Sequence, residues 1–275
     1  MCPVIFMKPN TLSRHQNIPN PASYRAFTLV ELVVVIAILA LLAAMSLPAL
    51  CKTNIKSRAL LCMGNKKVLT TAWLMYSAEN NNKLLDSRAW MTVEVSNPAS
   101  DAFIDLANQL PLQPLGKYLN GNVKEYRCPD DPRKSTRPGY VGTPACRTAS
   151  MNAYLGEGWT SGYFIYKKLS DLNRPGPMNT FLFADEGLSI NDGHFVIDMD
   201  TYDPNNLPGK QLTDVPATYH NMGGTFSFAD GRSELRKWKD PRTALPTGFG
   251  WVSPNNLDID WLQSKSSAKI TNPTR

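Results

Sequence analysis

The feature that most constrains this chain is an apolar run near its N-terminus. From Leu32 to Ala44 the sequence is LVVVIAILALLAA, without a polar side chain. The wider segment 27–50 contains a single charged residue, Glu31. As a helix it is roughly 36 Å long, enough to cross the apolar core of a bilayer. Core helices of soluble domains rarely lack a polar face over such a length. The sequence therefore predicts a transmembrane helix over residues 27–50.

The residues before the run predict its orientation. The leader, residues 1–26, contains Lys8, Arg14 and Arg25 and no acidic residue. Positive charge ahead of a span keeps the N-terminus in the cytoplasm, so we expect the larger C-terminal part to be exported. These three cations supply half of the formal net charge of +6. The exported part is therefore only weakly basic, and a nucleic-acid partner is not indicated.

After the predicted span, the pattern indicates an amphipathic continuation of the helix over residues 51–83. Asn80, Asn81 and Asn82 would end this helix. Its apolar face is interrupted once, at Lys66, and otherwise recurs at helical spacing. This face consists of Ile55, Ala59, Cys62, Leu69, Trp73 and Tyr76, whereas the opposite side carries Lys52, Lys56, Arg58, Asn65 and Lys67. We expect the apolar face to pack on a globular head.

Residues 84–263 favour a loop-rich head with an antiparallel sheet, and residues 264–275 a polar, flexible tail. The chain is thus expected to be α+β. Asp230-Gly231 predicts a two-residue type I′ hairpin turn, with Phe226 facing Leu235. The expected strands are Tyr163–Leu169, Thr180–Ala184, His194–Met199 and the hairpin Thr225–Trp238.

The stretch RAFTLVELVVVIAILA at 25–40 resembles the N-terminus of type IV prepilins and type II secretion pseudopilins. The resemblance implies cleavage between Ala26 and Phe27 by a prepilin peptidase, which also methylates the new amine of Phe27. Glycine is usual in the family at the position of Ala26. Alanine is the next smallest side chain, so we expect cleavage to survive.

Glu31 is expected to direct assembly. A carboxylate near the membrane core costs about 2.5–3.5 kcal/mol on insertion scales. Near the cytoplasmic face it could snorkel; in an assembly it could instead meet the Phe27 amine of a neighbouring subunit. The family assigns the second role to the matching glutamate, and we adopt it.

A second resemblance concerns the head. The segment YHNMGGTFSFADG at 219–231 places His220 ten positions before Asp230-Gly231 and is similar to the H-x9-D-G class of prepilin-like proteins. Other stretches resemble recurrent pieces of that class: RCPDD at 127–131, SMN at 150–152 and FADE at 183–186. From the residues themselves we expect His220 and Asp230-Gly231 to maintain the fold of the head. Asp-Gly supplies the positive backbone angles of the turn, and a ring nitrogen of His220 would satisfy a loop carbonyl.

The cysteines predict a disulfide in the exported head. Cys2 leaves with the leader, and Cys51 lies roughly 16 Å from Cys62 along one helix, too far to bond. Positions matching Cys62 and Cys128 are often occupied together in the H-x9-D-G class, so the resemblance implies this pair. A Cys128–Cys146 bond and unpaired buried thiols are the alternatives.

Polar residues also permit a metal or hydrolase site, to which His220, Asp230, Asp185, Glu186, Asp192 and His194 could contribute. The sequence lacks the H-E-x-x-H, G-x-S-x-G, Walker and C-x-x-C motifs. An extended chain would place His220 and Asp230 roughly 33 Å apart. We therefore expect no catalytic residue and no cofactor. The loop that contains Asp198, Asp200 and Asp203 is a weak candidate for a calcium site, because clustered oxygen ligands suit calcium.

Together these features predict a single-pass protein of a bacterial inner membrane, with a cytoplasmic N-terminus and a periplasmic head. It would be a non-enzymatic subunit of a type II secretion pseudopilus or type IV pilus-like filament, in the periplasm or at the surface. Its partners would be the prepilin peptidase, other pilin-like subunits, the filament assembly machinery and membrane lipid. The alternative is a membrane-tethered periplasmic binding module or metal-dependent enzyme that uses this export route.

The mature protein should begin at Phe27 with an N-methylated amine. The basis is the FTLVEL context behind a cationic leader. Mass spectrometry of the protein purified from membranes measures the N-terminus directly. A start near Ser46 or Pro48 would instead identify an ordinary signal peptide, which is cleaved after its apolar region.

Overall fold

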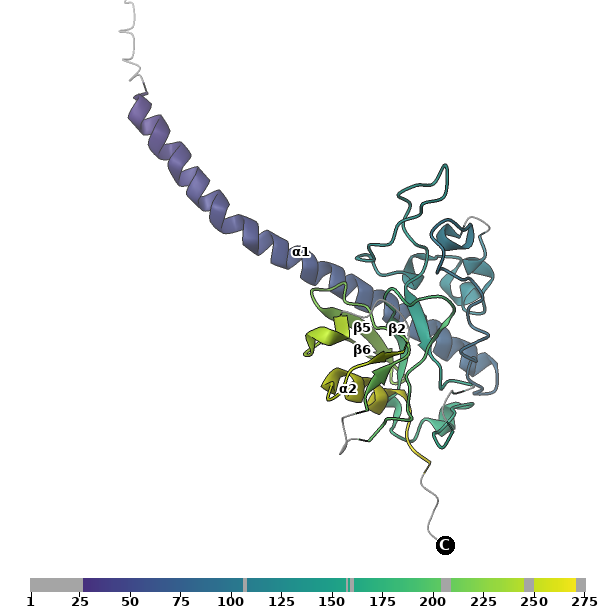
Figure 1. Cartoon of the computed structure of the whole chain (residues 1–275). Coiled ribbons are helices and arrows are strands. Elements are labelled where there is room, and N and C mark those ends of the chain that lie inside the picture. Colours follow the sequence, from purple (N-terminus) through teal and green to yellow (C-terminus); the bar gives the residue numbers. More distant parts are fainter. Residues whose placement is uncertain are drawn as a thin grey trace, which may run out of the picture. The chain divides into compact units, whose positions relative to one another are not determined.

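The computed structural model (Figure 1) describes residues 27–105, 108–156, 158, 161–203, 209–244 and 250–270, without the side chains of 46–53. The leader, and with it Ala26 and Cys2, lies outside these residues. The contacts divide the chain into two units, Met1–Ala49 and Leu50–Arg275. Each is considered by itself below.

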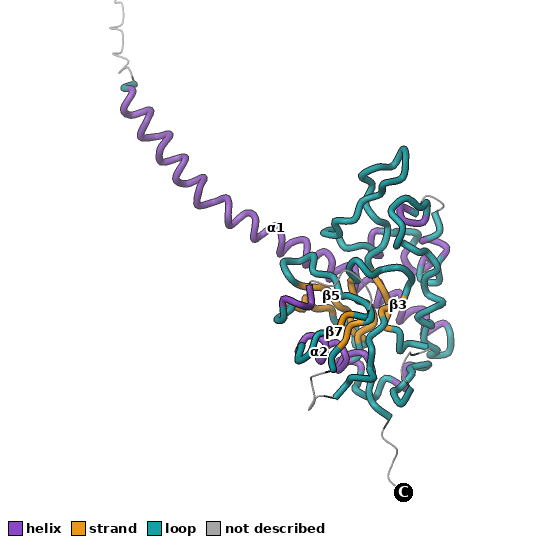
Figure 2. Tube along the Cα trace, viewed as in Figure 1, coloured by secondary structure: helices purple, strands orange, loops and turns teal. Residues whose placement is uncertain are grey.

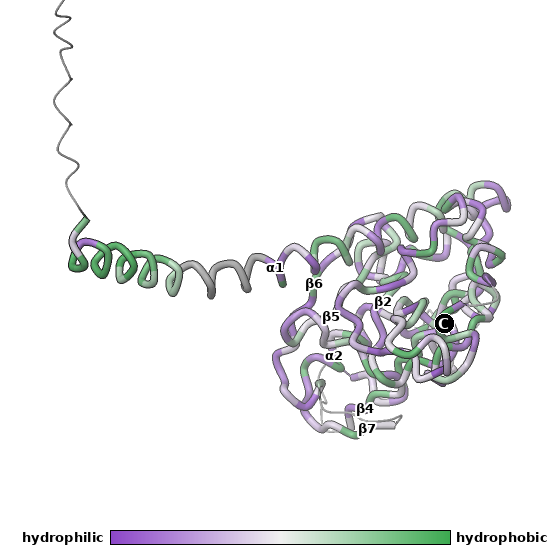
Figure 3. The backbone as a smooth tube through the Cα atoms, turned by 90° about the horizontal axis from the view of Figure 1, so that it is seen from above, coloured by the Kyte–Doolittle hydropathy of each residue, from purple (hydrophilic) through white to green (hydrophobic). Residues whose placement is uncertain are grey.

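Helix α1, Leu29–Glu79, continues through Pro48. Its part in the first unit consists mostly of hydrophobic residues, coloured green along the tube in Figure 3, and their side chains are exposed. From Phe27 to Met45 the large apolar side chains are 45–77% exposed. Within the described residues, however, no helix meets the combined length and hydropathy requirements for a membrane span. The span predicted over residues 27–50 therefore stays a prediction.

In the second unit, one face of α1 is buried. Ala59, Cys62, Leu69 and Trp73 are buried as expected, whereas Ile55 is exposed. Lys66, the interruption in the apolar face, is completely buried too. The helix ends at Glu79, where Asn81 and Asn82 adopt left-handed backbone conformations with φ of +56° and +60°. Asparagine tolerates this conformation better than most residues, so the local sequence stops the helix.

The centre of the second unit is a five-stranded sheet with the order β3-β1-β2-β5-β6. Its β1–β3 pair is parallel and its other pairs are antiparallel, so the sheet is mixed rather than purely antiparallel as predicted. Two short strands, β4 and β7, form a separate antiparallel pair. The strands are β1 Ala149–Asn152, β2 Phe181–Asp185, β3 His194–Phe195, β4 Gln211–Leu212, β5 Gly223–Phe228, β6 Ser233–Lys237 and β7 Trp251–Val252.

Two predicted strands differ from those observed. Residues 163–169 form no strand, because Tyr163, Tyr166 and Lys168 each take part only in an isolated bridge. The strand expected at His194–Met199 ends at Phe195. Loops and short 3-10 helices fill much of the remaining chain (Figure 2). These helices are η1 Ala102–Ile104, η2 Leu110–Leu112, η3 Gly116–Leu119, η4 Lys124–Tyr126, η5 Leu169–Asp171, η6 Pro177–Asn179 and η7 Pro241–Ala244.

The sheet lies between two helices. On one face, Asp185 and Thr225 contact α1 through Cys62. On the other face, Phe226 packs against Trp261 of α2, Leu257–Ser266, with ring centroids 5.2 Å apart. Adjacent residues of a strand point to opposite faces, so β5 contacts both helices. Helix α2 extends two residues beyond the predicted start of the tail at 264.

The β5–β6 hairpin has a different turn from the one predicted. Phe226 lies opposite Glu234 rather than Leu235. The loop contains three residues, because Phe228 N donates to Arg232 O at 2.9 Å and Gly231 N donates to Phe228 O at 2.9 Å. Positive φ falls on Gly231, at +90°. A three-residue loop of this kind, with glycine as the left-handed residue, shifts the register by one position.

Replacing Gly231 by Val should lower the free energy of unfolding by about 1–2 kcal/mol, because a β-branched residue resists positive φ. A Cβ at this position meets no atom within 4 Å, so steric crowding does not contribute. Gly231→Asn is the matched control and should cost less, since asparagine tolerates the left-handed region. Chemical denaturation measures both changes. Equal losses for Val and Asn would contradict the backbone explanation.

Candidate functional site

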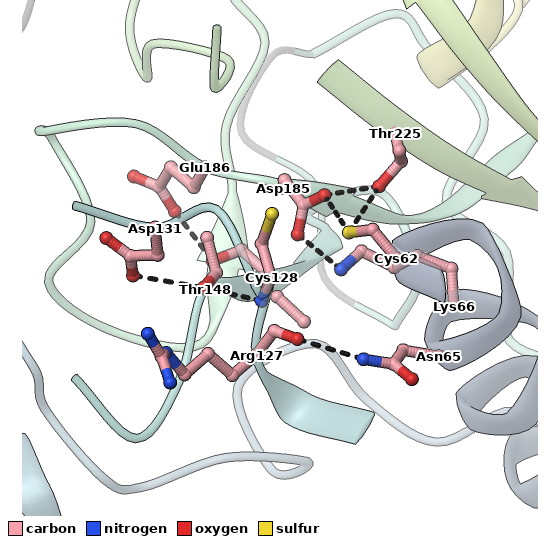
Figure 4. A network of polar contacts seen from close by, with 12 residues as sticks. Cys62, Asn65, Lys66, Arg127, Cys128, Asp131, Thr148, Asp185, Glu186 and Thr225 are labelled. Carbon is pink, nitrogen blue, oxygen red and sulfur yellow. Dashed lines mark hydrogen bonds and ion pairs between the residues drawn. The ribbon is translucent and has the colours of Figure 1, made fainter. Parts of the chain in front are cut away.

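Four potential metal-ligating residues converge inside the second unit. Cys62 comes from α1, Cys128 from the loop after η4, Asp185 from the end of β2, and His220 from the turn before β5. One ligand atom from each lies within 4.8 Å of the others, and all four residues are buried. We call these four residues the buried cluster; three of them are labelled in Figure 4.

Lys66 and Thr225 surround the Asp185 carboxylate. Lys66 Nζ lies 2.5 Å from Asp185 Oδ1, and both side chains are almost completely buried. The second oxygen, Oδ2, accepts from the Cys62 thiol at 2.8 Å and from the Thr225 hydroxyl (Figure 4). Burial is the largest single influence on the pKa of Lys66 and lowers it, but the charge and hydrogen bond of Asp185, together with the charges of Cys62 and Cys128, raise that pKa overall. The geometry is that of a buried ion pair.

His220 is held from both ring nitrogens. Nε2 lies 3.2 Å from Cys128 Sγ, and Nδ1 lies 2.9 Å from Asp130 Oδ2. Asp130 is also paired with Arg58 of α1, at 2.9 Å. The His220 ring thus bridges a thiol and a carboxylate. Its main-chain carbonyl accepts a hydrogen bond from Lys237.

The structure does not pair His220 with Asp230. Asp230 lies in the exposed hairpin loop, where its carboxylate accepts from Arg232 N at 3.1 Å. Of the three signature residues, His220 therefore lies in a different environment from Asp230 and Gly231. Gly231 and Asp230 shape the turn, whereas His220 belongs to the buried cluster.

The loop that carries Cys128 is fixed by polar contacts. Cys128 N donates to Thr148 Oγ1 at 2.9 Å, and that hydroxyl donates to Asp131 Oδ2 at 3.1 Å. Asn65 Nδ2 of α1 donates to Arg127 O at 3.0 Å. Figure 4 shows these contacts next to the buried cluster. Cys128 is consequently positioned by its backbone, independently of any bond at its sulfur.

The two thiols of the cluster differ in acidity. Burial raises the pKa of Cys62, but the hydrogen bond with Cys128 and the charge of Lys66 help to lower it overall. The hydrogen bond with Cys62, followed by burial, raises the pKa of Cys128. The Cys62 sulfur therefore carries negative charge more readily. Cys62, Cys128 and the half-buried Cys146 are free thiols in the structure, so the predicted disulfide stays a prediction.

The other residues considered from the sequence lie in separate places. Glu186 is buried and accepts from Ser150 and Ser189. His194 Nε2 pairs with Asp192 Oδ2 at 3.1 Å, at the start of β3. In the described part of the chain, the proposed calcium residues do not form a cluster of three potential metal ligands; these residues are Asp198, Asp200 and Asp203.

The sequence analysis missed Lys66 and Asp130 as parts of a site. A signal for Lys66 was present, because it is the one cation inside the apolar face of the helix. Asp130 belongs to the RCPDD stretch at 127–131, but the sequence did not indicate its partner, because its contact with His220 spans 90 positions of the chain. The ligand atoms of Cys62 and Cys128 lie within 4.8 Å of each other, and the disulfide predicted between these residues stays a prediction.

At the start of α1, Glu31 takes part in a capping box with Thr28. Thr28 N and Oγ1 donate to Glu31 Oε2 at 2.9 and 2.8 Å, and Glu31 N donates to Thr28 Oγ1 at 3.2 Å. Such reciprocal bonds satisfy backbone groups that a helix start leaves free. Glu31 therefore has a local partner in addition to the one expected in an assembly.

Together, the fold and the N-terminal segment define an α+β protein whose long N-terminal helix begins with an apolar run. Residues 22–47 match the family described as the prokaryotic N-terminal methylation motif. This segment therefore carries the N-terminal motif of type IV prepilin-like and pseudopilin-like proteins, which confirms the first resemblance. The motif supports membrane anchoring, processing by a prepilin peptidase and assembly with other pilin-like subunits.

The match ends at residue 47 and does not bear on the head. The resemblance of His220 and Asp230-Gly231 to the H-x9-D-G class therefore stays a prediction. No curated protein and no solved structure matches the chain.

Proposed function

We propose that this protein is a structural subunit of a pilus or type II secretion pseudopilus. Before assembly, residues 27–50 would anchor it in the inner membrane, with the leader in the cytoplasm and the head in the periplasm. After cleavage the subunit would leave the membrane and pack through α1 against other subunits. The observation that carries this proposal is the methylation motif at 22–47, which leads directly into α1.

The exposed apolar residues at the start of α1 support the proposal. Thirteen large apolar side chains between Phe27 and Met45 are at least 45% exposed. Apolar surface on this scale requires lipid or another protein to cover it. Lipid before assembly and neighbouring helices afterwards supply such a cover.

A second apolar surface lies further along the same helix, in the second unit. Leu61, Val68 and Met75 are 57, 43 and 46% exposed, and their helical spacing places them on a different face of α1 from the buried Cys62, Leu69 and Trp73. Gly64 lies three residues after Leu61 and four before Val68, and Met75 follows Val68 by seven. No atom lies within 4 Å of the place of a Cβ at Gly64. Small residues allow helices to approach closely. We call Leu61, Gly64, Val68 and Met75 the outer stripe and assign it to contact with a neighbouring subunit.

The alternative, a tethered binding module or enzyme, is less well supported. The buried cluster is enclosed by α1 and the sheet, with each of its four residues buried. A catalytic site must admit a substrate, and sites of this kind are usually concave and open. The enclosed arrangement favours a role in holding the head together.

Replacing Glu31 by Val should impair filament incorporation while membrane insertion persists. The change removes both the charge and the capping box. Glu31→Gln separates these roles, because glutamine also serves in capping boxes but carries no charge. If the charge pairs with a neighbouring Phe27 amine, both variants should assemble poorly. The measurement is the amount of each processed variant in sheared filaments relative to membranes.

Normal assembly of the Gln variant, with a defect only in the Val variant, would assign Glu31 to capping and overturn the charge-pair explanation. Normal assembly of both variants would remove Glu31 from the assembly process altogether. Retention of the processed wild-type protein in the membrane as an unassembled monomer would favour the tethered alternative.

Replacing Gly64 by Leu should reduce incorporation into filaments at least as strongly as replacing Glu31 by Val does. The larger side chain would separate helices that meet at the outer stripe. Gly64→Ala is the matched control; it adds one methyl group and should raise helix stability by up to ~1 kcal/mol. Thermal melts of both purified variants should show an intact head. Wild-type incorporation of the Leu variant would contradict the assignment of the outer stripe.

A further inference from the structure

We propose that the buried cluster is a structural site for a divalent transition metal, most suitably Zn²⁺, held by Cys62, Cys128, Asp185 and His220. These residues come from four separate segments of the chain, yet their ligand atoms lie within 4.8 Å of one another. Two sulfur atoms, an imidazole nitrogen and a carboxylate oxygen form a complete set of four ligands for tetrahedral zinc.

The spacing of these atoms suits such a site. Bond lengths of about 2.0–2.3 Å place the ligand atoms of a tetrahedral zinc site roughly 3.3–3.8 Å apart. Cys62 Sγ and Asp185 Oδ2 are 2.8 Å apart, and Cys128 Sγ and His220 Nε2 are 3.2 Å apart. Binding would therefore require changes of about an ångström, within the reach of side-chain rotation.

His220 is oriented as metal-binding histidines usually are. Its Nε2 faces the cluster, while Nδ1 is bonded to Asp130 at 2.9 Å. A carboxylate behind the ring fixes the orientation of the imidazole and strengthens it as a ligand. Arg58 in turn fixes Asp130. Nothing in a purely apolar packing role for His220 would require this chain of contacts.

The charges in the site also balance. Two thiolates and one carboxylate carry three negative charges, and a divalent cation leaves a net charge of −1. The buried ammonium of Lys66, which contacts Asp185 Oδ1, brings the sum to zero. The other oxygen, Oδ2, remains on the side of Cys62. From two neutral thiols and a neutral imidazole, binding of one ion would release two protons to solvent, with no change in oxidation state.

A Cys62–Cys128 disulfide is the competing state of the same two sulfurs. It would account for two members of the cluster. It would leave unexplained why His220, its partner Asp130 and the Lys66–Asp185 pair surround those sulfurs. A metal accounts for all of them, and the complete, enclosed ligand set indicates a structural rather than a catalytic ion. The ion would link α1 directly to the sheet.

The test uses the full chain, purified from membranes under reducing conditions. After chelator treatment the protein is titrated with Co²⁺, which gives visible absorption bands typical of tetrahedral coordination and a near-ultraviolet sulfur-to-cobalt band. We expect one Co²⁺ per chain, displaced by one Zn²⁺. Metal analysis of the untreated protein should likewise find close to one ion per chain.

Cys62→Ser, Cys128→Ser and His220→Ala should each weaken Zn²⁺ binding by at least tenfold in competition with a chromophoric chelator. Cys146→Ser is the matched control and should bind as the wild type does. Cys146 is a third free thiol of the head, and its sulfur donates to Ala102 O at 3.3 Å, outside the cluster.

Failure of the variants to fold would not leave the proposal untested, because the wild-type titration needs no substitution. Absence of tetrahedral cobalt bands in the reduced, folded wild-type protein would overturn it. So would peptide mapping that finds Cys62 bonded to Cys128 in protein purified with zinc present and oxygen excluded. Equal metal binding by Cys146→Ser and a large loss in Cys62→Ser would support it.

Discussion

The arrangement of the head depends on a buried ion pair between its long helix and its sheet. Lys66 and Asp185 have side chains that are 0 and 1% exposed, with charged atoms 2.5 Å apart. Either charge alone in this position would be strongly destabilising. The pair therefore permits one alignment of α1 with β2. A shift of the helix by one turn would separate the two charges and leave both buried without a partner.

This constraint divides the surface of α1 into two sides. The inner side carries Cys62, Lys66, Leu69 and Trp73 and is covered by the sheet and its loops. The other side carries the outer stripe, whose Leu61, Val68 and Met75 are exposed. The ion pair therefore fixes the position of α1 on the sheet of the second unit. Apolar packing alone would define that alignment less sharply, because a sliding apolar face loses little contact.

The sequence predicted those parts of the fold that depend on local patterns. The helix through Pro48, its stop at Asn80–Asn82 and the buried positions Ala59, Cys62, Leu69 and Trp73 follow from composition and spacing. The parallel β1–β3 pair could not be predicted in this way, because strand order depends on contacts between distant segments. The error in the predicted register of the β5–β6 hairpin was smaller. Asp-Gly is compatible with both two- and three-residue loops, and the choice moved Phe226 from Leu235 to Glu234.

The same distinction explains what the sequence indicated about the site. A single lysine in an apolar helix face signals a buried partner, but it does not identify Asp185, which lies 119 positions away. The resemblance that paired Cys62 with Cys128 indicated proximity, and a disulfide is one of two chemical reasons for two cysteines to be close. The other reason is a shared metal ion, which requires additional ligands. Only the folded chain brings His220 and Asp185 to those sulfurs, and with them the charge of Lys66 that would neutralise a metal-bound cluster.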